Sequence, residues 1–206
     1  MAKREKVVVS TGTFKIMFEK IVGFIKSLYP RENPVPLHAP RFLGNEKKYL
    51  SDCIDTTYVS YVGEYVGRFE DAIRQFTGAK YAVAVSSGTA ALHVALLLAE
   101  VAPGDEVITQ PLTFVATANA ISYCGAQPVF VDVERATLGL EPEKLDYFLV
   151  NNGIMKSDSR CYNKITGRKI AACVPMHTLG HPVRIDQIVE ICQKYQIPVV
   201  SYNRCN

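Results

Sequence analysis

The chain has 206 residues, 48% of them hydrophobic, which is enough for one sizeable core. Its net charge of +3 lies within residues 1–16, which carry four basic residues and one acidic residue, so the remainder is formally neutral. A neutral body lacks the basic surface that nucleic-acid binding needs, and no apolar run approaches the ~20 residues of a membrane span. The six cysteines form no C-x-x-C pair, so we expect reduced thiols in a cytoplasmic protein rather than zinc ligands or disulfides.

The first segment is predicted to be peripheral. Residues 17–29 have helical spacing, with one apolar face made of Phe18, Ile21, Val22, Ile25 and Leu28. Residues 30–36, "PRENPVP", break any helix and predict an extended linker. We therefore expect an N-terminal arm and helix over residues 1–36 and the main domain over residues 37–206.

Two helices are predicted before the first strand. Residues 45–55 indicate a short polar helix, and residues 64–78 indicate an amphipathic helix that ends at Gly78. The side chains expected to face inward on the second helix are Tyr65, Phe69, Ile73 and Phe76.

From residue 81 onward, short apolar runs alternate with helical segments. Strands are predicted in residues 81–85, 103–109, 128–133, 169–175 and 197–201. Helices are predicted in residues 89–101, 114–125, 141–150 and 184–196, and a polar loop in residues 151–168. This alternation is typical of an α/β fold in which helices cover both faces of a mostly parallel sheet.

The joint "VSSGTA" connects the strand at 81–85 directly to a helix. Gly88 permits a tight turn, and the first amides of the helix have no partner within it. Together with the hydroxyls of Ser87 and Thr89, these amides would form a cradle for an anion, most naturally a phosphate. The alternative is that Ser-Gly-Thr only caps the helix. Neither a dinucleotide fingerprint nor a Walker-type loop is present.

Two further loops follow predicted strand ends. Phe114, in "QPLTFVATANAI", could stack on a flat ring or could be an ordinary core residue. "VPMHTLGHP" contains His177 and His181 at a spacing of four, but Gly180 and Pro182 exclude one continuous helix, so no metal site is expected.

These loops together resemble the DegT/DnrJ/StrS family of sugar-nucleotide aminotransferases, which depend on pyridoxal phosphate (PLP). The likeness is carried by "GNEKKYL", "VSYVGEYVGRFE", "GAKYAVAVSSGTAALHVALLLA", "PGDEVITQPLTFVATANAI", "GAQPVFVDV" and "VPMHTLGHPVRID". It runs from about residue 36 to residue 200, and the opening "MFEKIVGFIKSLYP" is most similar to the legionaminic (nonulosonic) acid branch. The resemblance implies the large domain of a fold-type I PLP-transferase, a three-layer αβα architecture, here truncated.

The resemblance also implies roles for individual residues. Ser87, Gly88 and Thr89 would hold the PLP phosphate, and Phe114 would stack on the pyridine ring. His177 would lie beside the cofactor. Ser60 and Gly63 match a segment near the sugar site, although Tyr61 stands where the family usually has a second Ser. The implied reaction is amination at C4 of a 4-keto-6-deoxy sugar nucleotide with glutamate as donor, by a homodimer in cell-surface polysaccharide biosynthesis.

The chain departs from the family after "IPVV". The family continues with the Asp that pairs with the pyridinium nitrogen, whereas this sequence has "SYNRCN", which puts Tyr202 at that position. The Schiff-base Lys, two intervening strands and the small C-terminal domain would lie beyond residue 206. We therefore expect no catalytic residue in the chain and weak or absent PLP binding. Because the missing strands would flank both 81–85 and 197–201, we also expect unusual exposure at residues 81–85 and 199–200.

Two other functions stay open. One is a non-catalytic phosphate-ligand binding or heterodimerising fragment that keeps the anion cradle. The other, less favoured, is nucleic-acid binding by the basic arm, which is more often a solvated tail.

Overall fold

The computed structural model describes residues 11–36 and 40–203, and these fall into two compact units that divide between Thr57 and Tyr58. The basic residues Lys3, Arg4 and Lys6 lie outside the described residues. Five cysteines are described, and all five are free thiols. None of the described helices combines the length and the apolar character that crossing a bilayer requires.

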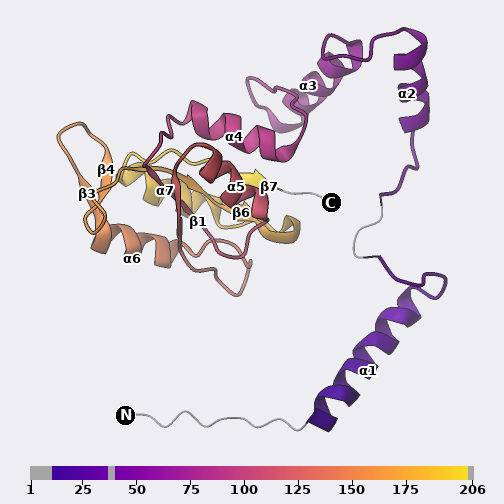
Figure 1. Ribbon diagram of the computed structural model, residues 1–206, viewed down its shortest axis with the longest axis horizontal. Coiled ribbons are helices and arrows are strands. Elements are labelled where there is room, and N and C mark those ends of the chain that lie inside the picture. Colours follow the sequence, from indigo (N-terminus) through magenta and orange to yellow (C-terminus); the bar gives the residue numbers. More distant parts are fainter. Residues whose placement is uncertain (1–10, 37–39, 204–206) are drawn as a thin grey trace. The chain divides into compact units, whose positions relative to one another are not determined.

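The first unit contains two helices, α1 (Thr11–Leu28) and α2 (Glu46–Asp55) (Figure 1). Both were predicted from the sequence, and α1 begins six residues earlier than expected. The predicted apolar face of α1 is present but uncovered, since Phe18 and Leu28 are more than half exposed. Among the residues of this unit whose burial is described, none is buried, those of α2 included.

The second unit is built around a three-stranded parallel sheet in the order β2-β1-β5. Its strands are β1 (Glu106–Thr109), β2 (Gln127–Phe130) and β5 (Ile170–Val174). Residue Val199 adds a single parallel bridge to Cys173 on the outer side of β5. Beyond it, β6 (Met176–His177) pairs in parallel with β7 (Tyr202–Asn203).

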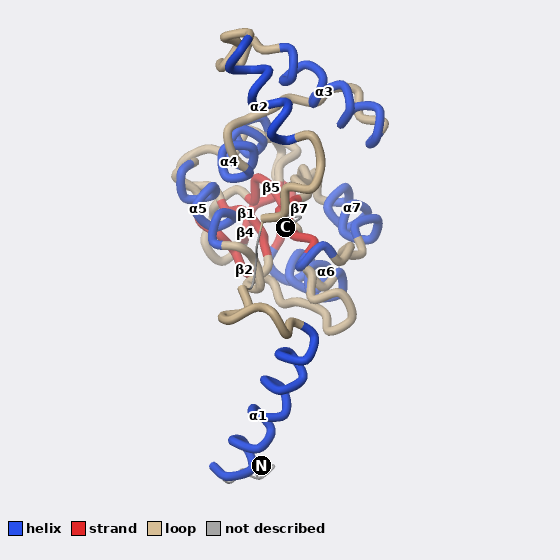
Figure 2. The backbone as a smooth tube through the Cα atoms, turned by 90° about the vertical axis from the view of Figure 1, so that its right-hand side faces the viewer, coloured by secondary structure: helices blue, strands red, loops and turns tan. Residues whose placement is uncertain are grey.

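Helices cover both faces of this sheet, as Figure 2 shows. One face carries α4 (Gly88–Leu98) and α5 (Val115–Tyr123), and the other carries α6 (Pro142–Asn152) and α7 (Ile185–Lys194). Because successive side chains of a strand point to opposite faces, Val107 packs in the core under α4 and α5 while Ile108 packs in the core under α6 and α7. The predicted three-layer α/β class is confirmed.

The core beneath α6 and α7 contains two adjacent thiols. Cys173 of β5 and Cys192 of α7 are both fully buried. The hydrogen bond with Cys192, together with burial, raises the pKa of the Cys173 thiol well above its usual value, so this thiol stays protonated. These cysteines are therefore packing residues, as the sequence predicted for reduced thiols.

Three of the expected elements differ in the structure. Residues 81–85 are extended but pair with no described strand, and residues 197–201 contribute only the bridge at Val199. The segment 151–168 is not simply a loop, because β3 (Gly153–Met155) and β4 (Cys161–Asn163) form an antiparallel hairpin within it. A short polar hairpin lacks the apolar alternation by which strands are found in a sequence.

The sequence correctly predicted helix α3 (Glu64–Thr77) and its end at Gly78, but the prediction that its apolar face is buried is wrong. Gly78 caps it with a φ of +72°, the left-handed conformation that glycine adopts without strain. Phe69 and Phe76 are 57% and 90% exposed, because no described layer lies against this face. Periodicity predicts that an apolar face exists, but whether it is buried depends on a neighbour that periodicity does not show.

Candidate cofactor site

The carboxyl ends of β1 and β5 are held together by Gln110, which is fully buried. Its Oε1 accepts hydrogen bonds from the amides of Leu140 (2.8 Å) and Met176 (3.1 Å). Its Nε2 donates to the carbonyl of Leu112 and to Oγ1 of Thr178, both at 2.9 Å. One side chain thus fixes three loops at the edge of the sheet where ligands of open α/β folds bind. Gln110 was not among the residues predicted for the site. The only feature of the sequence that points to it is its position as a polar residue directly after a strand.

The predicted phosphate cradle lies at the start of α4. Ser87 is the N-cap with an extended backbone, and its Oγ accepts from the amide of Ala90 at 3.2 Å. The capping alternative is therefore correct for the Ser87 hydroxyl. Within the described chain, no hydrogen bond is recorded for the amides of Gly88 and Thr89, which leaves two donors at the positive end of the helix.

Phe114 is the N-cap of α5 and is 39% exposed, so it is not an ordinary core residue. Its amide donates to Sδ of Met176 at 3.3 Å, and Oγ1 of Thr113 donates to the same sulfur at 3.0 Å. Met176 is buried and thereby ties the loop of Phe114 to the carboxyl end of β5. An aromatic ring that is partly exposed at such a position can stack on a flat ring.

His177 follows Met176 in β6, and both of its ring nitrogens are engaged. The amide of Val183 donates to Nδ1 at 3.0 Å, and Nε2 lies 2.8 Å from Oγ of Ser201. Because Nδ1 accepts, the network assigns the proton of the neutral ring to Nε2, which donates to Ser201. The imidazole is thus fixed in place, and His181 does not share a ligand site with it: the described residues contain no cluster of three or more side chains suited to a metal ion.

Tyr202 completes this group of contacts. It pairs with Met176 in the β6–β7 ladder, and its amide donates to the carbonyl of Pro175 at 3.0 Å. A Cβ on Gly88 would lie 3.7 Å from the Tyr202 hydroxyl and 3.8 Å from Cε2 of its ring. A chain of contacts therefore runs from Phe114 through Met176 and Tyr202 to Gly88, which links the loop of Phe114 to the start of α4.

The two predicted sugar-site residues lie in a different place. Ser60 and Gly63 form the tight turn that leads into α3, where the amide of Gly63 donates to the carbonyl of Ser60 at 3.2 Å. A Cβ on Gly63 would stand 3.2 Å from the carbonyl of Tyr58, which favours glycine in this turn. In the described chain, the hydrogen bonds of these two residues stay within the turn and the start of α3.

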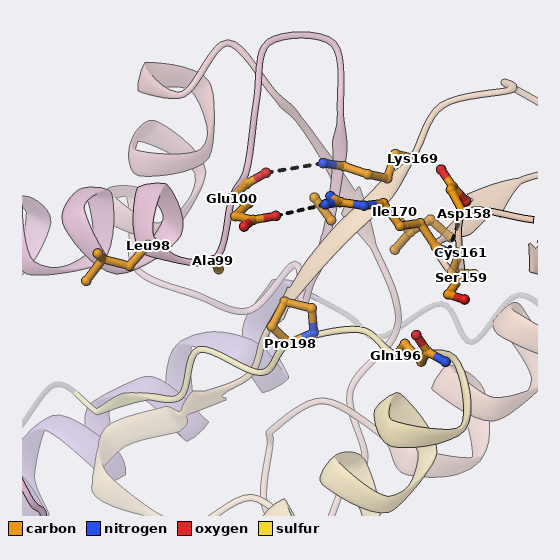
Figure 3. Close-up of a pocket in the computed structure, with 12 residues that line it drawn as sticks. Leu98, Ala99, Glu100, Asp158, Ser159, Cys161, Lys169, Ile170, Gln196 and Pro198 are labelled. Atoms are coloured by element: carbon orange, nitrogen blue, oxygen red, sulfur yellow. Dashed lines mark hydrogen bonds and ion pairs between the residues drawn. The ribbon is translucent and has the colours of Figure 1, made fainter. Parts of the chain in front are cut away.

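A pocket of about 410 Å³ lies at the opposite end of the sheet from this site (Figure 3). It is lined by the first residue of β5, Ile170, and by polar side chains around it. Its cations are already paired: Arg160 with Glu100 at 2.9 Å and Lys169 with Asp105 at 2.8 Å. We therefore place the candidate site at the carboxyl ends of the strands and not in this pocket, because its charges neutralise one another.

Comparisons with known proteins agree with a fold of this class. The DegT/DnrJ/EryC1/StrS aminotransferase family matches residues 42–201, and the chain belongs to this family. One relative, EpsN of Bacillus subtilis, is named a putative pyridoxal phosphate-dependent aminotransferase and is 37% identical over 165 residues, which are 80% of this chain and 40% of that protein. The GDP-perosamine synthase of Caulobacter vibrioides is 36% identical over 167 residues, which are 81% of this chain and 40% of that protein.

Solved structures give the same result. An aminotransferase from Psychrobacter cryohalolentis superposes with a TM-score of 0.67 at 30% identity, over 81% of this chain and 38% of that one. The structure of DesI with its TDP-sugar product superposes with a TM-score of 0.62 at 26% identity, over 79% of this chain and 37% of that one. The chain spans about 40% of the length of the curated relatives that it matches.

The residues at the site fit only part of a PLP molecule. The free amides of Gly88 and Thr89 suit its phosphate, and the exposed face of Phe114 suits its ring. The residue that contacts Gly88 from β7, however, is Tyr202, whose neutral phenol cannot act as the anionic partner of a pyridinium nitrogen.

Proposed function

We propose that this chain is the cofactor-holding part of a PLP-dependent aminotransferase that aminates a 4-keto-6-deoxy sugar nucleotide, with glutamate as donor, for cell-surface polysaccharide or nonulosonic acid biosynthesis. The observation that carries the proposal is the pair of amides at Gly88 and Thr89, for which the described chain shows no acceptor, at the start of a helix that contacts Tyr202 of the strand paired with Met176. The sugar-nucleotide part rests on the relatives, one of which bears the name GDP-perosamine synthase. A cytoplasmic location and a homodimer belong to the same proposal.

The residues have separate tasks in this proposal. The amides of Gly88 and Thr89 bind the phosphate, and Phe114 orients the ring by face contact. His177, fixed by Val183 and Ser201, holds the neighbouring loop in position. When bound, PLP supplies the electron sink that transamination requires.

The proposal also includes a limit on this chain alone. Lys169, directly before β5, donates to the carbonyl of Glu100 at the opposite end of the sheet, and Lys164 donates to the carbonyl of Asn151 in α6. No contact places a lysine at the cradle in the described chain. Without a positioned lysine and a carboxylate for the ring nitrogen, we expect reversible, weak PLP binding and no transamination.

Equilibrium dialysis of the chain with PLP and with inorganic phosphate tests this function. Phe114→Ala should weaken PLP binding about two- to tenfold, because an aromatic stacking contact is worth roughly 0.5–1.5 kcal/mol, and should leave phosphate binding unchanged. Tyr147→Ala is the matched control, since Tyr147 is an aromatic residue on α6 that is 69% exposed. Equal PLP affinity in all three chains, or a site-specific lysine adduct after borohydride treatment, would contradict the proposal.

A further inference from the structure

The amino end of α4 is not open on all sides. The hydroxyl and Cε2 of Tyr202 lie 3.7 and 3.8 Å from the position of a Cβ on Gly88, within ordinary van der Waals contact. Since Cα–Cβ bonds tilt toward the helix N-terminus, a group beside this position lies at the end from which an anion would approach the amides of Gly88 and Thr89. The ring of Tyr202 therefore takes up space next to the cradle.

Tyr202 is held there by its own backbone and by packing. Its pairing with Met176 and the bond from its amide to the carbonyl of Pro175 fix the main chain. The half-buried ring packs against the apolar core under α4 and α5. Moving the ring away would expose this apolar contact, so the aromatic side chain is a stable part of the wall of the site.

We propose that Tyr202 is a specificity-determining residue of the cradle, which leaves room for a small phosphate anion and disfavours a phosphate attached to a flat ring. This inference rests on the proposed function, because it concerns access to the same site. Inorganic phosphate needs only the helix amides. PLP carries its phosphate on a flat ring, so that ring must fit beside the amides, where the side chain of Tyr202 already lies.

The size of the side chain, and not its hydroxyl, carries the effect. Tyr202→Phe keeps the ring and should leave PLP affinity within twofold of the starting chain. Tyr202→Ala and Tyr202→Val both shorten the side chain, and they should bind PLP at least about tenfold more tightly. Val is included because a β-branched residue favours the β6–β7 pairing, so one variant keeps this ladder if Ala weakens it.

The test is equilibrium dialysis of the full chain and these three variants with PLP and, separately, with inorganic phosphate, with far-UV circular dichroism as a check of folding. Tighter PLP binding in the Ala or the Val variant, with phosphate affinity unchanged, supports the inference. PLP affinity equal within twofold in every folded variant overturns it but leaves the proposed function standing. Binding of neither ligand by any of the chains overturns both.

Discussion

Residues 81–85 and strand β1 are both short apolar runs that precede a loop and a helix, yet they have different structures. All four residues of β1 are buried, and the strand pairs with β2 on one side and β5 on the other. In 81–85, by contrast, Tyr81 and Val83 are 74% and 78% exposed, as expected from the sequence. The backbone there makes one recorded hydrogen bond, from the amide of Ala84 to Oε1 of Glu70 at 2.8 Å. Strand propensity therefore produced an extended chain, but only neighbouring strands produced a sheet.

The pairing of residues 198–200 with the outer side of β5 is intermediate between the full pairing of β1 and the unpaired segment 81–85. The amide of Val200 and the carbonyl of Pro198 bond to Cys173, but the amide and carbonyl of Val199 have no recorded partner in the described chain. Val199 and Val200 are half-buried, so their expected exposure is only partly seen. Unpaired backbone groups in apolar segments are the condition for edge pairing with another chain.

The largest difference between the two regions should appear in hydrogen exchange. Amides in the middle of β1 and β5 open only with the domain, whereas the amides of residues 81–85, apart from that of Ala84, have no acceptor among the described residues. We expect protection factors that differ by about a thousandfold or more, on the scale of a domain stability of several kcal/mol. Exchange measured by mass spectrometry at peptide resolution checks this, and strong protection throughout 81–85 would show that this segment has a partner in solution.

Gln110 offers a way to disrupt the well-paired region itself. Gln110→Leu removes the acceptor of the Leu140 and Met176 amides, so two buried donors lose their partner at about 1–3 kcal/mol each. We expect the free energy of unfolding to fall by about 3 kcal/mol or more in urea titrations. Gln193→Leu, at an exposed position of α7, is the control and should change it by less than about 0.5 kcal/mol. Similar losses in the two variants would mean that the Gln110 network does not stabilise the domain.

The sequence predicted the helices well because each is defined by its own periodicity and end signals. Gly78 at the end of α3 and Pro142 at the start of α6 are examples that need no tertiary information. The start of α4 at Gly88, with Ser87 as its N-cap, was predictable for the same reason. The β3–β4 hairpin, the exposure of Phe76 and the Gln110 network were not, because each depends on contacts between residues far apart in the chain. Val107 and Val83 illustrate this limit, since the same residue type in similar apolar runs is 0% exposed in one case and 78% in the other.

The same pair of valines allows a more direct test, in which the expected change in stability is smaller. Val107→Ala leaves a cavity in the core under α4 and α5 and should lower the free energy of unfolding by about 2 kcal/mol. Val83→Ala removes methyl groups that are already in contact with water and should change it by less than about 0.5 kcal/mol. Urea titrations of the two variants provide the measurement. Equal losses would contradict the contrast between a packed strand and an uncovered one.

The smallest effect on stability is expected from Val83→Lys. This variant tests whether the unpaired segment 81–85 mediates self-association, and not how much it contributes to stability. A charged side chain on an unpaired apolar strand discourages pairing with a second chain, because association would then have to desolvate the ammonium group. We expect this variant to reduce concentration-dependent self-association, measured by light scattering, while the free energy of unfolding stays within about 0.5 kcal/mol. Val59→Lys is the matched control, since Val59 is 76% exposed but lies outside the apolar run 81–85. If Val59→Lys reduced self-association as much as Val83→Lys, general surface hydrophobicity and not the open strand would be responsible.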